Sequence, residues 1–180
     1  MKAQFFIIGT VLICVLFFSG LVFYKTGIKT TPSKDLFYVS ENLKSEFPKA
    51  LNLGLKEKKG SSDFFEFNKF IKNMLQEKAV KFYSFWLIAE PLGTGLNVSV
   101  GNIRKPGTVI ININGDEKTI SLNEEETKSA VFSNPPEEFQ ITLSFGNKTK
   151  TMRWVRNKVS LYCWFSLERG ENAASNEIEA

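Results

Sequence analysis

The chain has 180 residues, enough for one membrane anchor and one modest domain but too few for two full-sized cores. Hydrophobic residues make up 43% of the sequence, which argues against an intrinsically disordered chain. The net charge is +4 and there is no histidine, so the commonest general base and the commonest transition-metal ligand are both missing.

The positive charges are scattered along the chain. A nucleic-acid-binding protein usually gathers its lysines and arginines on one face. We therefore interpret the two densest groups as solvated loop and strand faces, and we predict that nucleic acid is not a partner. These groups are Lys56, Lys58 and Lys59, and Lys148, Lys150, Arg153, Arg156 and Lys158.

Residues 5–24 read FFIIGTVLICVLFFSGLVFY and contain no charged side chain. A helix of about 20 residues spans roughly 30 Å, the thickness of the hydrocarbon core of a bilayer. The run also lacks the polar stripe of an amphipathic helix. Tyr24 ends this run and Lys25 follows it, an aromatic residue and a cation suited to the membrane interface. The sequence therefore predicts a membrane-spanning helix within residues 1–25.

A cleavable secretory signal is the alternative interpretation of this run. Such signals have apolar regions of about 7–15 residues that end at a small-x-small site. The present run is longer, and Phe18-Ser19-Gly20 carries Phe where a small residue should stand. Lipid attachment at Cys14 is also disfavoured, because Ile13 precedes it where lipoprotein signals carry a small residue.

The first residues, Lys2-Ala3-Gln4-Phe5, run directly into the apolar segment. This stretch of about a dozen residues resembles the class III signal of archaeal type IV pilin-like proteins. In that family a membrane peptidase cuts before the hydrophobic helix, after a Lys/Arg–Gly/Ala pair and often just ahead of Gln. The resemblance implies processing between Ala3 and Gln4. Ala3 replaces the more frequent Gly, and Ile8 stands where many pilins carry Glu, so an ordinary unprocessed anchor stays an open alternative.

The same resemblance implies that the C-terminal domain lies outside the cell, attached by a single membrane pass. The lysines near the two ends of the helix slightly favour the opposite orientation, since Lys25, Lys29 and Lys34 outnumber Lys2. Two glycosylation sequons, which begin at Asn97 and Asn147, agree with export.

Residues 26–80 form a polar linker followed by one or two short amphipathic helices. The first helix has apolar residues at helical spacing from Leu36 to Phe47, and Pro48 is expected to break it. The second begins near Asp63, which we expect to cap it. We expect its apolar face to pack on the following domain, with packing against neighbouring subunits as the alternative. That face consists of Phe64, Phe67, Phe70, Ile71, Met74 and Leu75.

In residues 81–169 the apolar side chains recur at every second position, and turn residues appear every eight to twelve positions. This pattern predicts an antiparallel β-sandwich of about seven strands. Trp86 is expected in its core, and Asn114-Gly115 predicts a tight hairpin. The fold class is therefore α+β, with an immunoglobulin-like sandwich. Residues 170–180 are acidic, lack apolar periodicity and are predicted to be a disordered tail. The expected strands are 82–90, 96–100, 109–113, 119–122, 139–145, 152–154 and 159–165.

The segment 96–145 also resembles the adhesion-type sandwich modules of prokaryotic cell surfaces. The resemblance rests on Val98-Val100-Asn102, then Val109-Ile111-Ile113-Gly115, then Pro135-Pro136, and last Phe139-Ile141-Leu143. In that family the module is a spacer or an adhesion unit and carries out no chemistry.

The sequence offers no catalytic constellation. The densest carboxylates, Glu124-Glu125-Glu126 and Glu137-Glu138, lack the alternation of ligands and glycine found in calcium loops. No nucleophile elbow or phosphate-binding loop is present. Cys163 lies in an alternating apolar strand and is interpreted as a core residue, and with Cys14 in the anchor we predict no disulfide. We predict a protein that is not an enzyme and needs neither a metal nor a cofactor.

We expect a membrane-anchored protein of the cell surface with a structural or adhesion role. The more specific expectation is a minor pilin-like subunit. The lipid bilayer is the predicted partner, with self-assembly or contact with other surface proteins through the helix. The alternative is a permanently anchored ligand- or partner-binding module of a membrane complex.

Overall fold

The computed structural model describes residues 32–57, 59–146 and 148–180. The predicted anchor and its processing residues Ala3 and Gln4 lie outside these ranges. Within them, no helix is both long and apolar enough to cross a bilayer.

In the described part of the chain, two helices precede the strands. Helix α2 (Pro32–Lys56) continues through Pro48, so the predicted break at this residue is wrong. A proline inside a helix removes one backbone hydrogen bond, but Phe47 before it and Leu51 after it are both buried against the rest of the domain. Helix α3 (Gly60–Gln76) follows after a short turn. Asp63 does not cap it and lies in its first turn, where a carboxylate favours the helix dipole.

Nine strands within the described residues form two antiparallel sheets, two strands more than the sequence predicted. The larger sheet has the order β5-β2-β1-β8-β9 and the smaller has the order β4-β3-β6-β7. The strands are β1 (Lys81–Leu92), β2 (Gly95–Ile103), β3 (Gly107–Ile113), β4 (Asp116–Leu122), β5 (Glu126–Phe132), β6 (Glu138–Phe145), β7 (Lys148–Val155), β8 (Ser160–Arg169) and β9 (Asn172–Glu179).

The disordered tail predicted for residues 170–180 is instead the strand β9. It pairs with β8 from Arg169↔Asn172 to Tyr162↔Glu179. Only Ile178 of this strand is buried. The strand is held by hydrogen bonds between backbone groups, and these leave no apolar pattern in the sequence. The other strand that the sequence did not predict is β5, which pairs with β2 at the opposite edge of the sheet.

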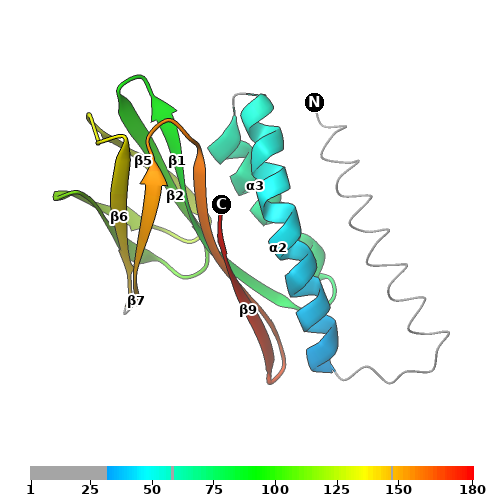
Figure 1. The fold of residues 1–180 in the computed structure, drawn as a ribbon. Helices are drawn as coiled ribbons and strands as arrows, with labels where there is room; N and C mark the ends of the chain where they lie inside the picture. The colour runs from blue at the N-terminus through cyan, green and yellow to red at the C-terminus, as the bar shows by residue number, and fades with distance from the viewer. Residues whose placement is uncertain (1–31, 58, 147) are drawn as a thin grey trace.

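The domain has three layers, a pair of helices, the five-stranded sheet and the four-stranded sheet (Figure 1). Both helices lie on one face of the larger sheet, and the smaller sheet covers its other face. Strand β1 is therefore buried on both sides: Trp86 and Ile88 face the helices, whereas Phe85 and Leu87 face the smaller sheet. This explains its nearly continuous run of apolar residues.

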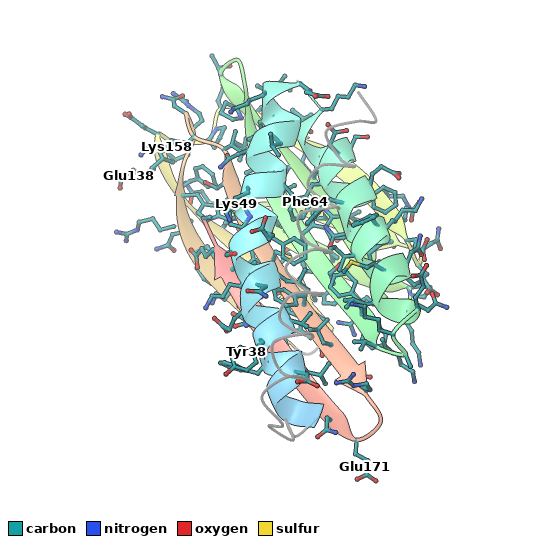
Figure 2. The ribbon with its side chains drawn as sticks, turned by 90° about the vertical axis from the view of Figure 1, so that its right-hand side faces the viewer. Tyr38, Lys49, Phe64, Glu138, Lys158 and Glu171 are labelled. Carbon is teal, nitrogen blue, oxygen red and sulfur yellow. The ribbon has the colours of Figure 1, made fainter. Side chains whose placement is uncertain are left out.

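A cluster of phenylalanine rings joins the helices to the sheet. The ring centroid of Phe47 on α2 lies 5.6 Å from the centroid of Phe64 and 5.8 Å from that of Phe67, both on α3. It also lies 5.2 Å from Phe165 on β8 and 6.5 Å from Phe82 on β1. In Figure 2, Phe64 lies between the helices and the strands behind them. Most of the aromatic face of α3 therefore packs within its own domain, whereas Phe70 of the predicted face is exposed.

The hairpin predicted at Asn114-Gly115 is present between β3 and β4. Ile113 pairs with Asp116, so the loop contains two residues, and both have positive φ angles of 49° and 96°. This conformation matches a type I′ turn, which follows the right-handed twist of the strands. The β6–β7 hairpin is equally short, since Phe145 pairs with Lys148.

Candidate functional site

The residues predicted for processing and glycosylation are only partly within the described ranges. Ala3, Gln4 and Asn147 lie outside them. Asn97 lies within β2, where its side chain hydrogen-bonds the Glu90 carboxyl of the paired strand. Burial raises the pKa of Glu90, and the bond from Asn97 opposes this effect. Ser99, the third residue of this sequon, is buried.

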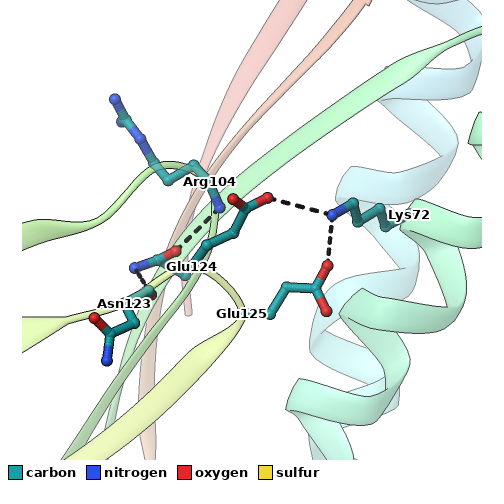
Figure 3. A network of polar contacts seen from close by, with 6 residues as sticks. Lys72, Arg104, Asn123, Glu124 and Glu125 are labelled. Atoms are coloured by element: carbon teal, nitrogen blue, oxygen red, sulfur yellow. Dashed lines mark hydrogen bonds and ion pairs between the residues drawn. The ribbon is translucent and has the colours of Figure 1, made fainter.

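The acidic run at residues 124–126 contacts a helix. Glu124 and Glu125 both form ion pairs with Lys72 of α3, as Figure 3 shows. The pKa of Lys72 is raised, chiefly by its hydrogen bond to Glu125. Glu126 accepts a hydrogen bond from the Asn123 backbone and another from the Lys128 ammonium. Across residues 32–57, 59–146 and 148–180, no three carboxylates or thiols are grouped closely enough to hold a metal ion.

A buried amide holds the start of the loop between β2 and β3. Asn102 is completely buried, and its amide group donates to the carbonyl of Asn123 at 2.9 Å. Its side-chain oxygen accepts from the backbone N–H of Arg104 at 3.0 Å (Figure 3). Because both ends of the amide are bonded, the position of the Arg104 backbone is fixed relative to the β4–β5 turn.

Next to this loop lies a cleft of about 790 Å³, which we call the basic aromatic cleft. It lies at one end of the sandwich and combines four segments of the chain. These are Phe85 of β1, the β2–β3 loop with the start of β3, the β6–β7 hairpin with its flanking strand ends, and the face of β8 that is turned to the smaller sheet. The lining contains aromatic and cationic side chains in roughly equal number, namely Phe85, Phe145, Tyr162, Trp164, Arg104, Lys105, Lys148 and Lys150.

Stacked rings make the wall of the cleft rigid. Phe85 on β1 and Phe145 at the end of β6 stack with their centroids 4.4 Å apart and their planes 18° from parallel. Phe85 and Tyr162 are buried, while Phe145 and Trp164 are partly exposed. The exposed parts of these rings provide apolar surface that a ligand can contact.

Cations lie over these rings. The guanidinium of Arg104 is 4.7 Å from the centroid of Phe145 and 5.4 Å from that of Trp164. The ammonium of Lys148 is 5.3 Å from the Trp164 centroid, and that of Lys150 is 5.9 Å from Tyr162. Each contact is attractive because the face of an aromatic ring carries partial negative charge.

The cleft carries excess positive charge. Lys150 is balanced by Glu177 of β9, whose carboxylate lies 3.2 Å from its ammonium. Among the residues that the structure describes, none of Arg104, Lys105 and Lys148 has an ion pair with a carboxylate. The cleft therefore attracts an anion.

Tyr162 stays neutral over the physiological range of pH. Burial raises the pKa of its phenol well above the ordinary value of 10.0, and the charge of Glu177 adds to the rise. The tyrosine therefore contributes a neutral ring and a hydroxyl to the cleft.

The sequence analysis missed this site because it treated the group from Lys148 to Lys158 as a solvated face. In the structure, Lys148 and Lys150 lie on the same side of β7 as Met152 and Trp154, both of which are buried in the sandwich. The period of two that connects these four residues is visible in the sequence and indicates that the two lysines face inward. Their meeting with Arg104 depends on the tertiary fold.

Among the residues that the structure describes, the charged and hydroxyl side chains that line the cleft are Arg104, three lysines, Thr108, Ser144 and Tyr162, and the cations can bind an anion. Cys163 lies on the opposite face of β8, completely buried, and burial raises the pKa of its thiol. A thiol in that state is a poor nucleophile.

Comparisons with known proteins give no family for this chain. No protein-family model matches it, and a search of curated proteins also found no match.

Proposed function

We propose that this chain is a membrane-anchored adhesion protein of the cell surface, whose β-sandwich lies outside the membrane and binds through the basic aromatic cleft. The observation that carries the proposal is the cleft itself, in which partly exposed aromatic rings lie beside cations that have no ion pair among the described residues. A surface of this kind favours ligand binding over a purely structural role.

The order of the strands supports an immunoglobulin-like sandwich. In the first seven strands, β2 lies between β1 and β5 in one sheet, and β3-β6-β7 are neighbours in the other. The chain passes between the sheets after β2, after β4 and again after β5. These connections agree with the Greek-key pattern of that architecture, which is common in cell-surface domains. The added pair β8-β9 extends the larger sheet beyond β1 and gives the helices a wider surface to cover.

The membrane attachment rests on the uncharged run at residues 5–24, which leads into the described helix α2 after a short linker. The minor pilin-like form rests on the opening Lys2-Ala3-Gln4 alone. Most of the aromatic face of α3 is covered by its own sheet, and Phe70 is a member of that face that stays exposed.

Labelling of a single introduced cysteine tests which side of the membrane the domain occupies. Glu171 lies at the exposed β8–β9 turn (Figure 2). In intact cells, Glu171→Cys should react with a maleimide that cannot cross membranes. The unmodified chain should not react, because Cys163 is buried and Cys14 belongs to the predicted membrane-spanning run. Labelling of the variant only after lysis would contradict an external domain.

Mass spectrometry of the mature chain tests the pilin-like form separately. A mature N-terminus at Gln4 supports it. An intact Met1, or a chain that begins at Lys2, would leave the permanently anchored binding module as the correct form.

A further inference from the structure

The geometry of the basic aromatic cleft restricts the class of ligand it can bind. Its volume of about 790 Å³ is within the usual range of roughly 300–1,000 Å³ for sites that hold small ligands. A ligand of a few sugar-sized rings fits this space, whereas a folded protein surface does not enter it.

Two cations from different segments converge on one ring. Arg104 from the β2–β3 loop and Lys148 from the β6–β7 hairpin both lie within 5.4 Å of the Trp164 centroid. Neither has a carboxylate partner among the residues that the structure describes. Both residues line the same cleft, so an oxyanion bound there is attracted by a guanidinium and by an ammonium. Lys105 adds further positive charge beside Arg104.

The same cations argue against a nucleobase as the ligand. Single-stranded nucleic acids bind by stacking their bases on open aromatic faces. Here Arg104 lies over both Phe145 and Trp164, so these faces already have a partner. A sugar ring binds mainly through its hydroxyls, which need polar partners and less aromatic face than a stacked base needs. Thr108 and Ser144 line the cleft, and the Ser144 hydroxyl hydrogen-bonds that of Thr149.

We propose that the basic aromatic cleft binds an acidic oligosaccharide, with the carboxylate of a uronate-type sugar held between Arg104 and Lys148 beside Trp164. This inference rests on the proposed function, since a domain outside the cell meets the acidic glycans of other surfaces. It specifies the ligand class that the adhesion site recognises.

Titration of the full-length protein in detergent tests the proposal. The probe is the trimer of galacturonic acid, followed by the fluorescence of Trp164, the cleft tryptophan, with Trp164→Phe to assign the signal. Arg104→Gln and Lys148→Gln should each weaken binding about tenfold, because each removes a charge-assisted hydrogen bond. The matched control is Arg153→Gln on the opposite face of β7, which should leave the affinity unchanged. Binding should weaken from about 50 to about 500 mM NaCl.

Three further ligands test which chemical class of ligand the cleft binds. A neutral trisaccharide should not compete with the uronate trimer, and inorganic phosphate should compete only weakly because it lacks the rings. Equal binding of the neutral sugar, or an affinity that Arg104→Gln leaves unchanged, would overturn the proposal. Tighter binding of a single-stranded oligothymidylate would also overturn it and assign the cleft to nucleic acid. All these measurements use solubilised protein, so a failure here is distinct from a failure of the labelling experiment on membrane orientation.

Discussion

The indole ring of Trp86 occupies the space that a side chain on Gly101 would need. The two residues are directly paired between β1 and β2, and a Cβ atom placed on Gly101 would lie 2.2 Å from Cζ2 of the ring. Trp86 is completely buried between this strand and the rings of Phe64 and Phe65. The glycine therefore determines how closely the helix layer approaches the larger sheet.

Gly101→Ala should destabilise the domain by about 1–3 kcal/mol, because the added methyl group forces the indole out of a fully packed position. The measurement is chemical unfolding followed by far-ultraviolet circular dichroism. The double variant Gly101→Ala/Trp86→Phe supplies the control, since the smaller ring leaves room for the methyl group. Its loss should be less than the sum of the two single losses. Strict additivity would show that the contact between the two residues does not limit the packing.

A buried polar pair connects α3 to β1. The hydroxyl of Ser84 donates to the side-chain oxygen of Asn68 at 2.7 Å, and the amide of Asn68 donates to the Phe64 carbonyl at 2.8 Å. Both side chains are fully buried. Ser84→Ala should therefore cost about 1–3 kcal/mol of unfolding free energy, because the Asn68 oxygen loses its partner.

The control for this pair removes both polar groups. Asn68→Leu/Ser84→Ala should be less destabilising than the two single changes added together, since no buried polar atom is then left without a partner. Equal unfolding midpoints for Ser84→Ala and the unmodified chain would contradict the role assigned to the bond.

How far the sequence predicted this fold depends on which faces of each element are buried. The strand predicted at residues 82–90 is present as β1, and its nearly continuous apolar run reflects burial on both faces of the sheet. Strand β5 could not be found in the same way, since only Phe132 of its seven residues is buried. The cleft was hidden for another reason. Arg104, Phe145 and Trp164 are far apart in the sequence, and only the packing of two sheets brings them together.

Strand β9 can be tested directly, because the sequence predicted a disordered tail there. Ile178 on β9 is buried against the helix layer, and Asn176 bonds Ser40 and Glu41 of α2 at 3.0 and 2.9 Å. Ile178→Ala should cost about 2–5 kcal/mol in unfolding free energy. Ser175→Ala, on the exposed face of the same strand, should change it by no more than about 0.5 kcal/mol. Equal stability of both variants would restore the disordered tail predicted from the sequence.

The anchor prediction is testable without reference to the described residues. Leu16 lies at the centre of the apolar run 5–24. Leu16→Arg should reduce membrane insertion, since an arginine at the centre of a helix costs about 2.5–3.5 kcal/mol on insertion scales. The measurement is the fraction of protein that resists carbonate extraction, and Leu16→Ile is the conservative control. Equal partitioning of all three chains would show that this segment does not span the membrane.

The buried thiol of Cys163 should make the domain less stable at alkaline pH. Burial raises the pKa of the thiol above its ordinary value of 9.0. Well below pH 9 the thiol is protonated in both the folded and the unfolded chain, so pH has no effect through this group. Above that value the unfolded chain loses the proton while the folded chain keeps it, and unfolding becomes more favourable by up to about 1.4 kcal/mol per pH unit.

Cys163→Ala should remove this part of the pH dependence. The variant is expected to be less stable at neutral pH, because it loses buried volume, but its unfolding free energy should fall less steeply between about pH 9 and about pH 10.5. Tyr162, whose pKa is raised as well, is present in both chains, so the difference between the two slopes isolates the thiol. Urea unfolding at several pH values, followed by tryptophan fluorescence, gives both slopes. Parallel slopes would mean that the thiol ionises as readily in the folded domain as in the unfolded chain, and that β8 opens to water at alkaline pH.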